Sequence, residues 1–396
     1  MNPAPAGGSR TERILVTDAE TRAALAAVRS LGRAGHEIHT TSARPRELAS
    51  ASRFVRAEHV LPHAERAPDA WASALEALFR SERFDRILPI TELSLGAIYA
   101  AGLDRRLPCL APTHASYAMA TDKYALLELA REVGIRVPKS VLVEAPASLT
   151  ALPDGFAYPA ILKARRSRFR AGAGWASGAV VLVRDDSELL RAVRDPGFAE
   201  GLLVQEFLPG HGEGIFLLAR GGTCLAAFAH RRLREKPPSG GVSVVRESVE
   251  PDPKLLAASQ ALIARVGLDG VAMIEFRCPP GEEPALMEIN PRLWGSLQLA
   301  IDAGIDFPGL LWRMHAGLPI EPPRAKLGVR TRWLLGDLDH LLIALKRPEM
   351  REATGRSRSA VVLDFLRSFA DGSRLEVLRG DDPRPFLREL RLWLGL

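Results

Sequence analysis

The first hundred residues alternate short apolar strands with helical segments, and this order constrains the fold more than any other feature of the sequence. Strand-like runs at residues 13–17, 37–41 and 86–90 are separated by helical segments at residues 19–34 and 68–81. Such alternation is typical of an open parallel sheet. The turn after the first strand reads Thr-Asp-Ala-Glu-Thr and lacks the GxGxxG pattern, which counts against binding of a dinucleotide.

Between residue 159 and about residue 289 the pattern changes to strands joined by Gly-rich connections. We therefore expect an α+β body with largely antiparallel sheets in this part of the chain. A helix is expected over residues 121–134, ended by Gly134. The 396 residues are enough for two or three domains, each with its own core.

Composition excludes several classes of protein. With 47% hydrophobic and 25% charged residues the chain is a folded protein rather than a disordered one. Only seven of its 53 basic residues are lysines, and the arginines are scattered without interleaved aromatics, so no nucleic-acid partner is expected. The three cysteines show no CxxC spacing, and no apolar stretch approaches about 18 residues. We expect a cytoplasmic protein without a membrane segment.

The strongest chemical signal lies on a predicted hairpin that carries Glu275 on one strand and Glu288, Asn290 and Arg292 on and after the next. Glu288 and Asn290 are two residues apart, so their side chains share one face of the strand. Three such oxygen ligands suit Mg²⁺, and Arg292 adds a positive charge beside them. The alternative interpretation is a solvated hairpin, although its apolar flanks make exposure of these residues harder to explain.

A second signal is Lys163, which ends an apolar strand and precedes a Gly-rich basic loop that runs to Gly178. An ammonium group can contact phosphate oxygens, and backbone N–H groups of small residues can close over a polyphosphate. The loop is not the Walker pattern, and a flexible surface loop is the alternative interpretation.

Two further segments complete the set. Residues 205–208 end an apolar strand whose backbone can meet an adenine edge, with Glu213 in reach of a ribose; an ordinary strand and turn is the alternative. Arg231 and Arg232 precede a Pro-Pro-Ser-Gly-Gly loop, and their guanidinium groups can bind carboxylate or phosphate in bidentate fashion. A solvated charged hairpin is the alternative for this segment.

Taken in order, these pieces resemble the ATP-grasp superfamily, and most closely its carboxylate–amine ligases. The resemblance covers about residues 13–320 and rests on Lys123 in Thr-Asp-Lys-Tyr, Lys163, the Gly-rich loop, Gln-Glu-Phe-Leu, and Glu275 with Glu-Ile-Asn-Pro-Arg. It implies an N-terminal open parallel α/β (pre-ATP-grasp) domain, a lid subdomain and an ATP-grasp body. The implied boundaries are 1–115 for the first domain, 116–320 for the ATP-grasp domain with its lid at about 140–207, and 321–396 for an extension of unknown role.

The resemblance also implies a role for each residue of the motifs. Lys123 and Lys163 would contact the phosphates of ATP, with Gly172 and Gly174 in the loop that covers them. Glu275, Glu288 and Asn290 would hold Mg²⁺, with Mn²⁺ as an alternative, and Arg292, Arg231 and Arg232 would steady the transferred phosphoryl group. The remaining implied contacts are Gln205, Glu206, Phe207 and Leu208 with adenine, Glu213 with ribose, and Ser239, Gly240, Gly241 and Ser296 with the acceptor substrate.

The function implied is an ATP- and Mg²⁺-dependent ligase that activates a carboxylate as an acyl phosphate and couples it to an amine, releasing ADP and phosphate. Its partners would be small-molecule carboxylates and amines, and a homodimer is left open. An ATP-dependent carboxylase and a nucleotide-binding regulator without turnover are the alternatives. The sequence does not name the substrates.

Overall fold

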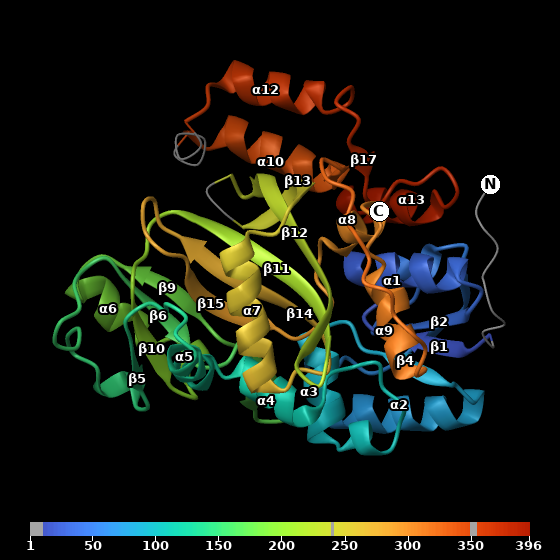
Figure 1. Ribbon diagram of the computed structural model, residues 1–396, viewed down its shortest axis with the longest axis horizontal. Helices are drawn as coiled ribbons and strands as arrows, with labels where there is room; N and C mark the ends of the chain where they lie inside the picture. The colour runs from blue at the N-terminus through green and yellow to red at the C-terminus, as the bar shows by residue number, and fades with distance from the viewer. Residues whose placement is uncertain (1–10, 239–240, 349–354) are drawn as a thin grey trace.

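The computed structural model describes residues 11–238, 241–348 and 355–396 (Figure 1). Its first part is an open parallel sheet, as expected, with strand order β3-β2-β1-β4. Helices α1 and α3 each begin after a threonine cap, Thr21 or Thr91, whose side chain accepts a backbone N–H of the first turn. The elements are β1 (Arg13–Val16), α1 (Arg22–Arg33), β2 (Glu37–Ser42), β3 (Val55–Val60), α2 (Pro68–Glu82), β4 (Arg86–Leu88) and α3 (Glu92–Ala100).

A second sheet, the lid sheet, is antiparallel with strand order β5-β10-β6-β9. It follows two helices, and the second of them, α5, is the helix expected over residues 121–134; Asp122 caps it by accepting the backbone N–H of Ala125. The elements are α4 (His114–Thr121), α5 (Lys123–Glu132), β5 (Ser140–Val143), β6 (Ala160–Ala164), β9 (Val180–Val183), α6 (Asp186–Ala192) and β10 (Leu202–Glu206).

The body is a seven-stranded sheet with order β15-β14-β11-β12-β13-β16-β17, antiparallel except for its last pair. Alternation along β11 gives the sheet two buried faces, because Ile215 and Leu217 belong to one core cluster and Phe216 and Leu218 to another. The elements are β11 (His211–Arg220), β12 (Thr223–Lys236), β13 (Val242–Val249), α7 (Pro253–Val266), β14 (Gly270–Cys278), β15 (Ala285–Asn290), α8 (Leu297–Asp302), α9 (Phe307–His315), β16 (Arg330–Arg332) and β17 (Arg374–Leu375).

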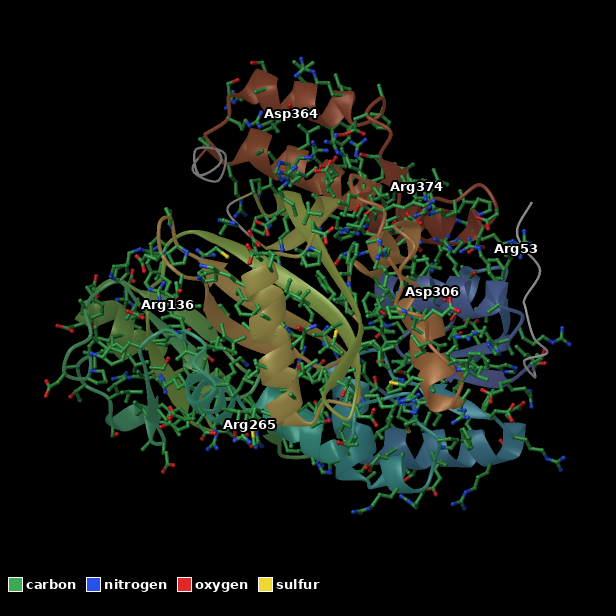
Figure 2. All side chains as sticks on the ribbon, in the orientation of Figure 1. Arg53, Arg136, Arg265, Asp306, Asp364 and Arg374 are labelled. Atoms are coloured by element: carbon green, nitrogen blue, oxygen red, sulfur yellow. The ribbon has the colours of Figure 1, made fainter. Side chains whose placement is uncertain are left out.

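The chain after residue 320 extends the body sheet with β16 and β17 and then returns to the N-terminal sheet. Its helices are α10 (Leu334–Lys346), α12 (Arg358–Arg367) and α13 (Arg384–Trp393), and Figure 1 shows α13 beside α1. The fully buried Asp382 accepts hydrogen bonds from Arg29 Nε (2.9 Å), Ser52 Oγ (2.7 Å) and the backbone N–H of Arg53, which is labelled in Figure 2. The C-terminal segment therefore links the body to the N-terminal domain.

No helix in the described ranges is both long and apolar enough to cross a bilayer.

Replacing Asp382 by alanine tests whether this link holds the domains together. The change leaves the guanidinium of Arg29, which is 1% exposed, buried without its carboxylate, and an uncompensated buried charge costs about 3–5 kcal/mol. We expect a loss of that order in the free energy of unfolding, measured by urea denaturation. The control is Asp381→Ala, because the Asp381–Arg33 pair is exposed and such pairs contribute about 0–1 kcal/mol; equal losses in the two variants would contradict the assignment.

Candidate functional site

Three oxygen-bearing side chains meet on the β14–β15 hairpin. Glu275 and Glu288 lie directly opposite each other in the antiparallel register, and Asn290 follows two residues later on the same face of β15. Asn290 Nδ2 donates to Glu288 Oε1 at 3.0 Å. The register confirms the shared face that the spacing predicts and leaves carboxylate and amide oxygens together beside a cavity.

Two buried lysines from other elements border these carboxylates. Lys163, near the end of β6, places Nζ 3.3 Å from Glu288 Oε2 and donates to the carbonyl of Met287. Lys123, the first residue of α5, donates to Ser167 Oγ at 2.6 Å. Both lysines are less than a tenth exposed, so their charges act in a poorly screened environment.

The positions of these lysines and glutamates shift their pKa values, lowering those of Lys123 and Glu288 and raising that of Glu275. Burial and the neighbouring Lys163 lower the pKa of Lys123 to about 8. For Glu288, burial alone would raise the pKa, but Lys163 and Lys123 outweigh it and hold the pKa at about 2. Burial and the facing charge of Glu288 raise the pKa of Glu275. A pair of facing carboxylates with one raised pKa fits a divalent cation, which would relieve their repulsion.

Two of the three predicted arginines lie at this cluster. Arg292 Nη2 donates to Asn290 Oδ1 at 3.3 Å, and no carboxylate among the described residues lies within ion-pair distance of its guanidinium. Arg232 Nη2 lies 3.7 Å from Glu275 Oε2. Both guanidinium groups lie beside the carboxylates, but Arg232 also pairs with Glu235 through Nη1 at 3.1 Å.

Arg231 points to the other face of β12, because consecutive residues of a strand alternate between faces. Its Nη2 donates to Glu247 Oε2 at 2.6 Å, and its side chain is 63% exposed. Of the Arg231–Arg232 pair, the structure brings only Arg232 to the carboxylates.

A cavity of about 1140 Å³ opens beside the cluster, lined by residues of both the lid and the body. Lys163, Glu275, Glu288 and the predicted adenine segment 205–208 are among its walls. Within that segment Gln205 Nε2 donates to Ser140 Oγ, and Glu206 Oε1 accepts the backbone N–H of Lys139. These two side chains bind the lid itself, so contacts of this segment with a nucleotide would come from its backbone and from the exposed Phe207.

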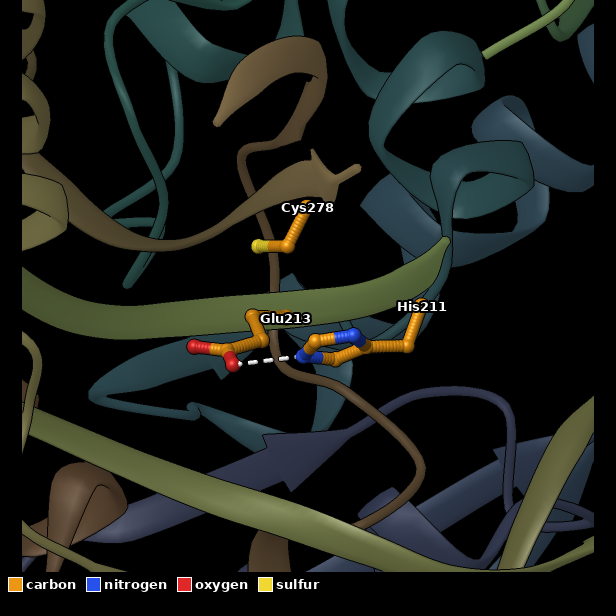
Figure 3. Close-up of side chains that lie close together, drawn as sticks. All are labelled: His211, Glu213 and Cys278. Atoms are coloured by element: carbon orange, nitrogen blue, oxygen red, sulfur yellow. Dashed lines mark hydrogen bonds and ion pairs between the residues drawn. The ribbon is translucent and has the colours of Figure 1, made fainter. Parts of the chain in front are cut away.

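Glu213 lies at the rim of the same cavity. It pairs across the sheet with the buried Phe276, so it is on the face of β11 opposite to that of Gly214, the partner of Glu275. Its carboxylate bonds His211 Nε2 at 2.9 Å, and Cys278 lies close to both (Figure 3). Burial raises the pKa of the Cys278 thiol to about 11, which disfavours the thiolate that a metal would need. The ribose contact of Glu213 stays a prediction.

The Gly-rich segment departs from the expected loop. It forms a hairpin of β7 (Arg168–Ala171) and β8 (Gly174–Ser177) that lies on the N-terminal domain. Arg168 Nη1 lies 2.8 Å from Glu65 Oε1, and Arg170 Nη2 lies 2.9 Å from Asp69 Oδ2. Neither Gly172 nor Gly174 lines the large cavity. In this conformation the hairpin stands away from that cavity, so a role in covering phosphates requires it to leave the N-terminal domain.

The residues expected to shape the acceptor site do not all line the large cavity. Gly241 lines the large cavity, whereas Ser239 and Gly240 lie outside the described residues. Ser296 Oγ lies 3.0 Å from His230 Nε2. Burial and the nearby arginines lower the pKa of His230 far below its usual range, so this imidazole is neutral and Ser296 is bound to it rather than directed into the cavity.

Glu92 is a residue that the sequence reasoning missed. It is the first residue of α3, just after β4, and shares a small cavity with Lys123, Glu288 and Asn290. Burial raises its pKa, and Arg292 and Lys123 oppose the shift. Its position directly beyond the third predicted strand was the available signal, since functional groups gather beyond the carboxyl ends of parallel strands.

Residues 198–336 match the family model described as an ATP-grasp in the biosynthetic pathway with Ter operon. No curated protein sequence matches the chain. Solved structures with the same fold include a biotin carboxylase–ATP complex from Campylobacter jejuni (15% identity, 81% of this chain and 74% of that one, TM-score 0.64). An L-amino acid ligase from Bacillus licheniformis matches with 18% identity, 80% and 76% coverage and a TM-score of 0.58.

An N5-carboxyaminoimidazole synthetase from Staphylococcus aureus matches with 15% identity over 85% of this chain and 86% of that one, with a TM-score of 0.63. These likenesses define the fold as that of ATP-grasp enzymes, as expected from the sequence. Over residues 198–336 the match to an ATP-grasp family model agrees with this fold.

Gly96→Ala should weaken the contact of the β7–β8 hairpin with the N-terminal domain. A Cβ atom at Gly96 would lie 3.0 Å from the ring of Trp175 on β8, so the ring must shift by a few tenths of an ångström and its packing on α3 is disturbed. We expect trypsin to cleave at Arg170 several times faster in this variant, as followed by mass spectrometry. The control is Gly380→Ala, whose Cβ would meet no neighbouring atom; identical cleavage rates in the two variants would show that Trp175 does not anchor the hairpin.

Proposed function

We propose that the chain is an ATP- and Mg²⁺-dependent ligase that activates a carboxylate as an acyl phosphate and couples it to an amine. The observation that carries the proposal is the cluster of Glu275, Glu288 and Asn290. The ammonium group of Lys163 lies against Glu288, and Arg292 beside the cluster has no carboxylate partner in the described chain. The likeness to an L-amino acid ligase supports it. Phosphoryl transfer needs positioning and neutralised charge rather than a protein nucleophile.

The large cavity would take ATP, with its triphosphate toward Lys163 and Lys123 and its base toward residues 205–208. Glu275, Glu288 and Asn290 would hold Mg²⁺, and Mn²⁺ suits the same oxygen donors. The metal would neutralise charge on the phosphates. Arg292 and Arg232 would bind the oxygens of the phosphoryl group as it moves.

Two group transfers make up the reaction. An oxygen of the substrate carboxylate bonds the γ-phosphorus as the bond to the β-phosphate oxygen breaks, which gives an acyl phosphate and ADP. The amine nitrogen then bonds the acyl carbon, the bond from carbon to the phosphate oxygen breaks, and the amine loses a proton. Water would intercept the acyl phosphate, so closure of the lid over the cavity is part of the proposal.

The likeness to a biotin carboxylase favours a second candidate, ATP-dependent carboxylation with bicarbonate as the carboxylate. ADP and phosphate would be released in that reaction too. The two candidates therefore differ in the carboxylate that the assay must contain.

Incubation with Mg-ATP and pairs of carboxylates and amines tests the proposal through release of ADP and phosphate. We expect ADP release that depends on both substrates and an amide product by mass spectrometry. Release that depends on bicarbonate would favour the carboxylase, and AMP with pyrophosphate would contradict an acyl phosphate. ATP binding without any substrate-dependent release would favour a nucleotide-binding regulator.

Variants of one hairpin serve as controls for that assay. Glu288→Gln should lower turnover at least about 100-fold, since a metal oxygen and the partner of Lys163 are lost together. Glu283→Gln, at the exposed turn of the same hairpin, should retain full activity. Thermal unfolding of both variants would show whether the fold is intact, and full activity in the first would refute the metal assignment.

The lowered pKa of Lys123, about 8, predicts how nucleotide binding depends on pH. The side chain carries its charge below that pKa and loses it above, so metal-free ADP should bind more weakly as the pH rises from 7 to 9. In Lys123→Arg the guanidinium stays charged throughout this range, and the decline should largely disappear. Calorimetry at several pH values measures both, and an equal decline in the variant would mean that another group is responsible.

A further inference from the structure

A second cavity, of about 550 Å³, lies where the N-terminal sheet, the body and the C-terminal segment meet. The N-terminal domain contributes residues 20–23 after β1 and residues 90–93 after β4. The body contributes Arg292, and the C-terminal segment contributes Trp333 and Glu389. Of the described residues that were individually given a role from the sequence, only Arg292 lines this cavity.

The position of the second cavity in the N-terminal sheet is one at which ligands bind in α/β proteins. Strand β1 lies between β2 and β4; the chain passes from β1 to β2 on one side and later returns from β3 to β4 on the other side of β1. Such a switch point leaves a crevice beyond the strand ends, and open α/β sheets bind ligands there. Residues 20–23 and 90–93 form this crevice, and Glu92 joins it to the small cavity that holds Lys123, Glu288 and Asn290.

The cationic side chains of the second cavity are mostly paired with acids outside it. Arg22 Nη1 lies 2.6 Å from Glu376 Oε2, and its guanidinium stacks on the Trp333 ring at 3.9 Å. Arg168 Nη1 lies 2.8 Å from Glu65 Oε1. Of the three arginines in the wall, only Arg292 has no carboxylate partner in the described chain.

The acidic side chains of the same wall have no such partners. Glu20, Glu92 and Glu389 all line the cavity, and within the described chain none has a cationic side chain within 4 Å. Three carboxylates thus face one available guanidinium. Arg22 and Arg168 also line the wall but are held by their own carboxylate partners. The acidic excess therefore lies among the unpaired side chains, and a ligand cation close to them would be bound favourably.

Glu389 is the most constrained of these carboxylates. Its Oε1 accepts the indole N–H of Trp333 at 2.7 Å, which fixes the side chain on α13. Its Oε2 is buried and has no hydrogen-bond partner, although buried polar atoms are almost always satisfied. Burial raises the pKa of Glu389 to about 7, although the nearby charge of Arg22 opposes the shift.

We propose that the second cavity binds the amine substrate and that Glu389 selects one that carries a further cationic group besides the reacting amine. The inference rests on the proposed ligase function, whose phosphoryl site adjoins this cavity through Glu92. The reacting amine would lie near Glu92 and the second ammonium or guanidinium group near Glu389. Glu389 is thus a specificity residue supplied by the C-terminal segment, outside the ATP-binding machinery.

L-Lysine and L-norleucine are matched probes, since they differ mainly in the terminal ammonium group. Calorimetry with the full chain and Mg-ADP should show at least about tenfold tighter binding of lysine, the size of a charge-assisted hydrogen bond. Glu389→Gln keeps the shape and an acceptor for Trp333, and it should remove this preference while leaving the affinity for Mg-ADP unchanged. Arg391→Gln, exposed on the same helix, should keep the preference.

The outcomes separate this inference from the ligase function because binding is measured without turnover. Equal affinity for the two probes in the natural chain, or a lysine preference that survives Glu389→Gln, would overturn the inference. Lysine selectivity without ADP release in the substrate assay would leave the inference standing and refute the ligase. Amide formation with neutral and cationic amines alike would support the ligase function and refute the inference about Glu389.

Discussion

Buried pairs of arginine and carboxylate side chains are the interaction on which the rest of the structure depends. Glu376 bonds both Arg246 and Arg22, from the body and the N-terminal domain, and both Arg246 and Glu376 are almost wholly buried. Such groups are costly to bury, and removal of one partner costs more than the pair contributes. The N-terminal sheet and the body are therefore fixed relative to each other by charges that cannot be separated cheaply.

The lid is held by interactions of a different kind. Its β7–β8 hairpin meets the N-terminal domain through Arg170 and Asp69, a largely exposed pair, and through Arg168 and Glu65, which are about a third exposed. Exposed pairs contribute about 0–1 kcal/mol each. The Trp175 ring beside Gly96 and the hydrogen bond from the Trp175 backbone N–H to the carbonyl of Glu65 (2.7 Å) also hold the hairpin. Buried pairs thus hold the domains around the second cavity, whereas the hairpin proposed to cover the first cavity is held by more exposed contacts.

The sequence predicts those parts of the site that depend on local rules. Alternation along a strand is enough to place Glu288 and Asn290 on one face, and the hairpin brings Glu275 opposite. The same alternation requires Arg231 and Arg232 to point to opposite faces, but it does not say which of them faces the carboxylates. The fold class also follows from local patterns, because strand and helix periodicities are visible in short windows.

What the sequence does not predict depends on contacts between distant segments. Arg29 and Asp382 are 353 residues apart, and no spacing rule joins them. The arginine excess therefore looked like a property of composition, whereas Arg29, Arg246 and Arg332 are among the largest fully buried side chains. A guanidinium group satisfies several acceptors at once in a fixed plane, as Arg29 does with Asp382 and the carbonyls of Glu376 and Val377. An ammonium group could not replace it there.

The two cavities differ in the charge that their walls leave unpaired, and in the proposed function this difference would order the reactants. Lys163 lines the first cavity beside the carboxylate pair, and Lys123 lines the small cavity that shares Glu288 with it, an arrangement that would attract phosphates with their metal. The second presents Glu20, Glu92 and Glu389, unpaired in the described chain, beside the arginines of its wall, and in the proposed function these carboxylates would favour an amine. Glu92 and Arg292 stand at the boundary, so an activated acyl group and its nucleophile would be drawn from opposite sides to one place. A ligase with a single cavity of mixed charge would have no such means of keeping ATP out of the amine site.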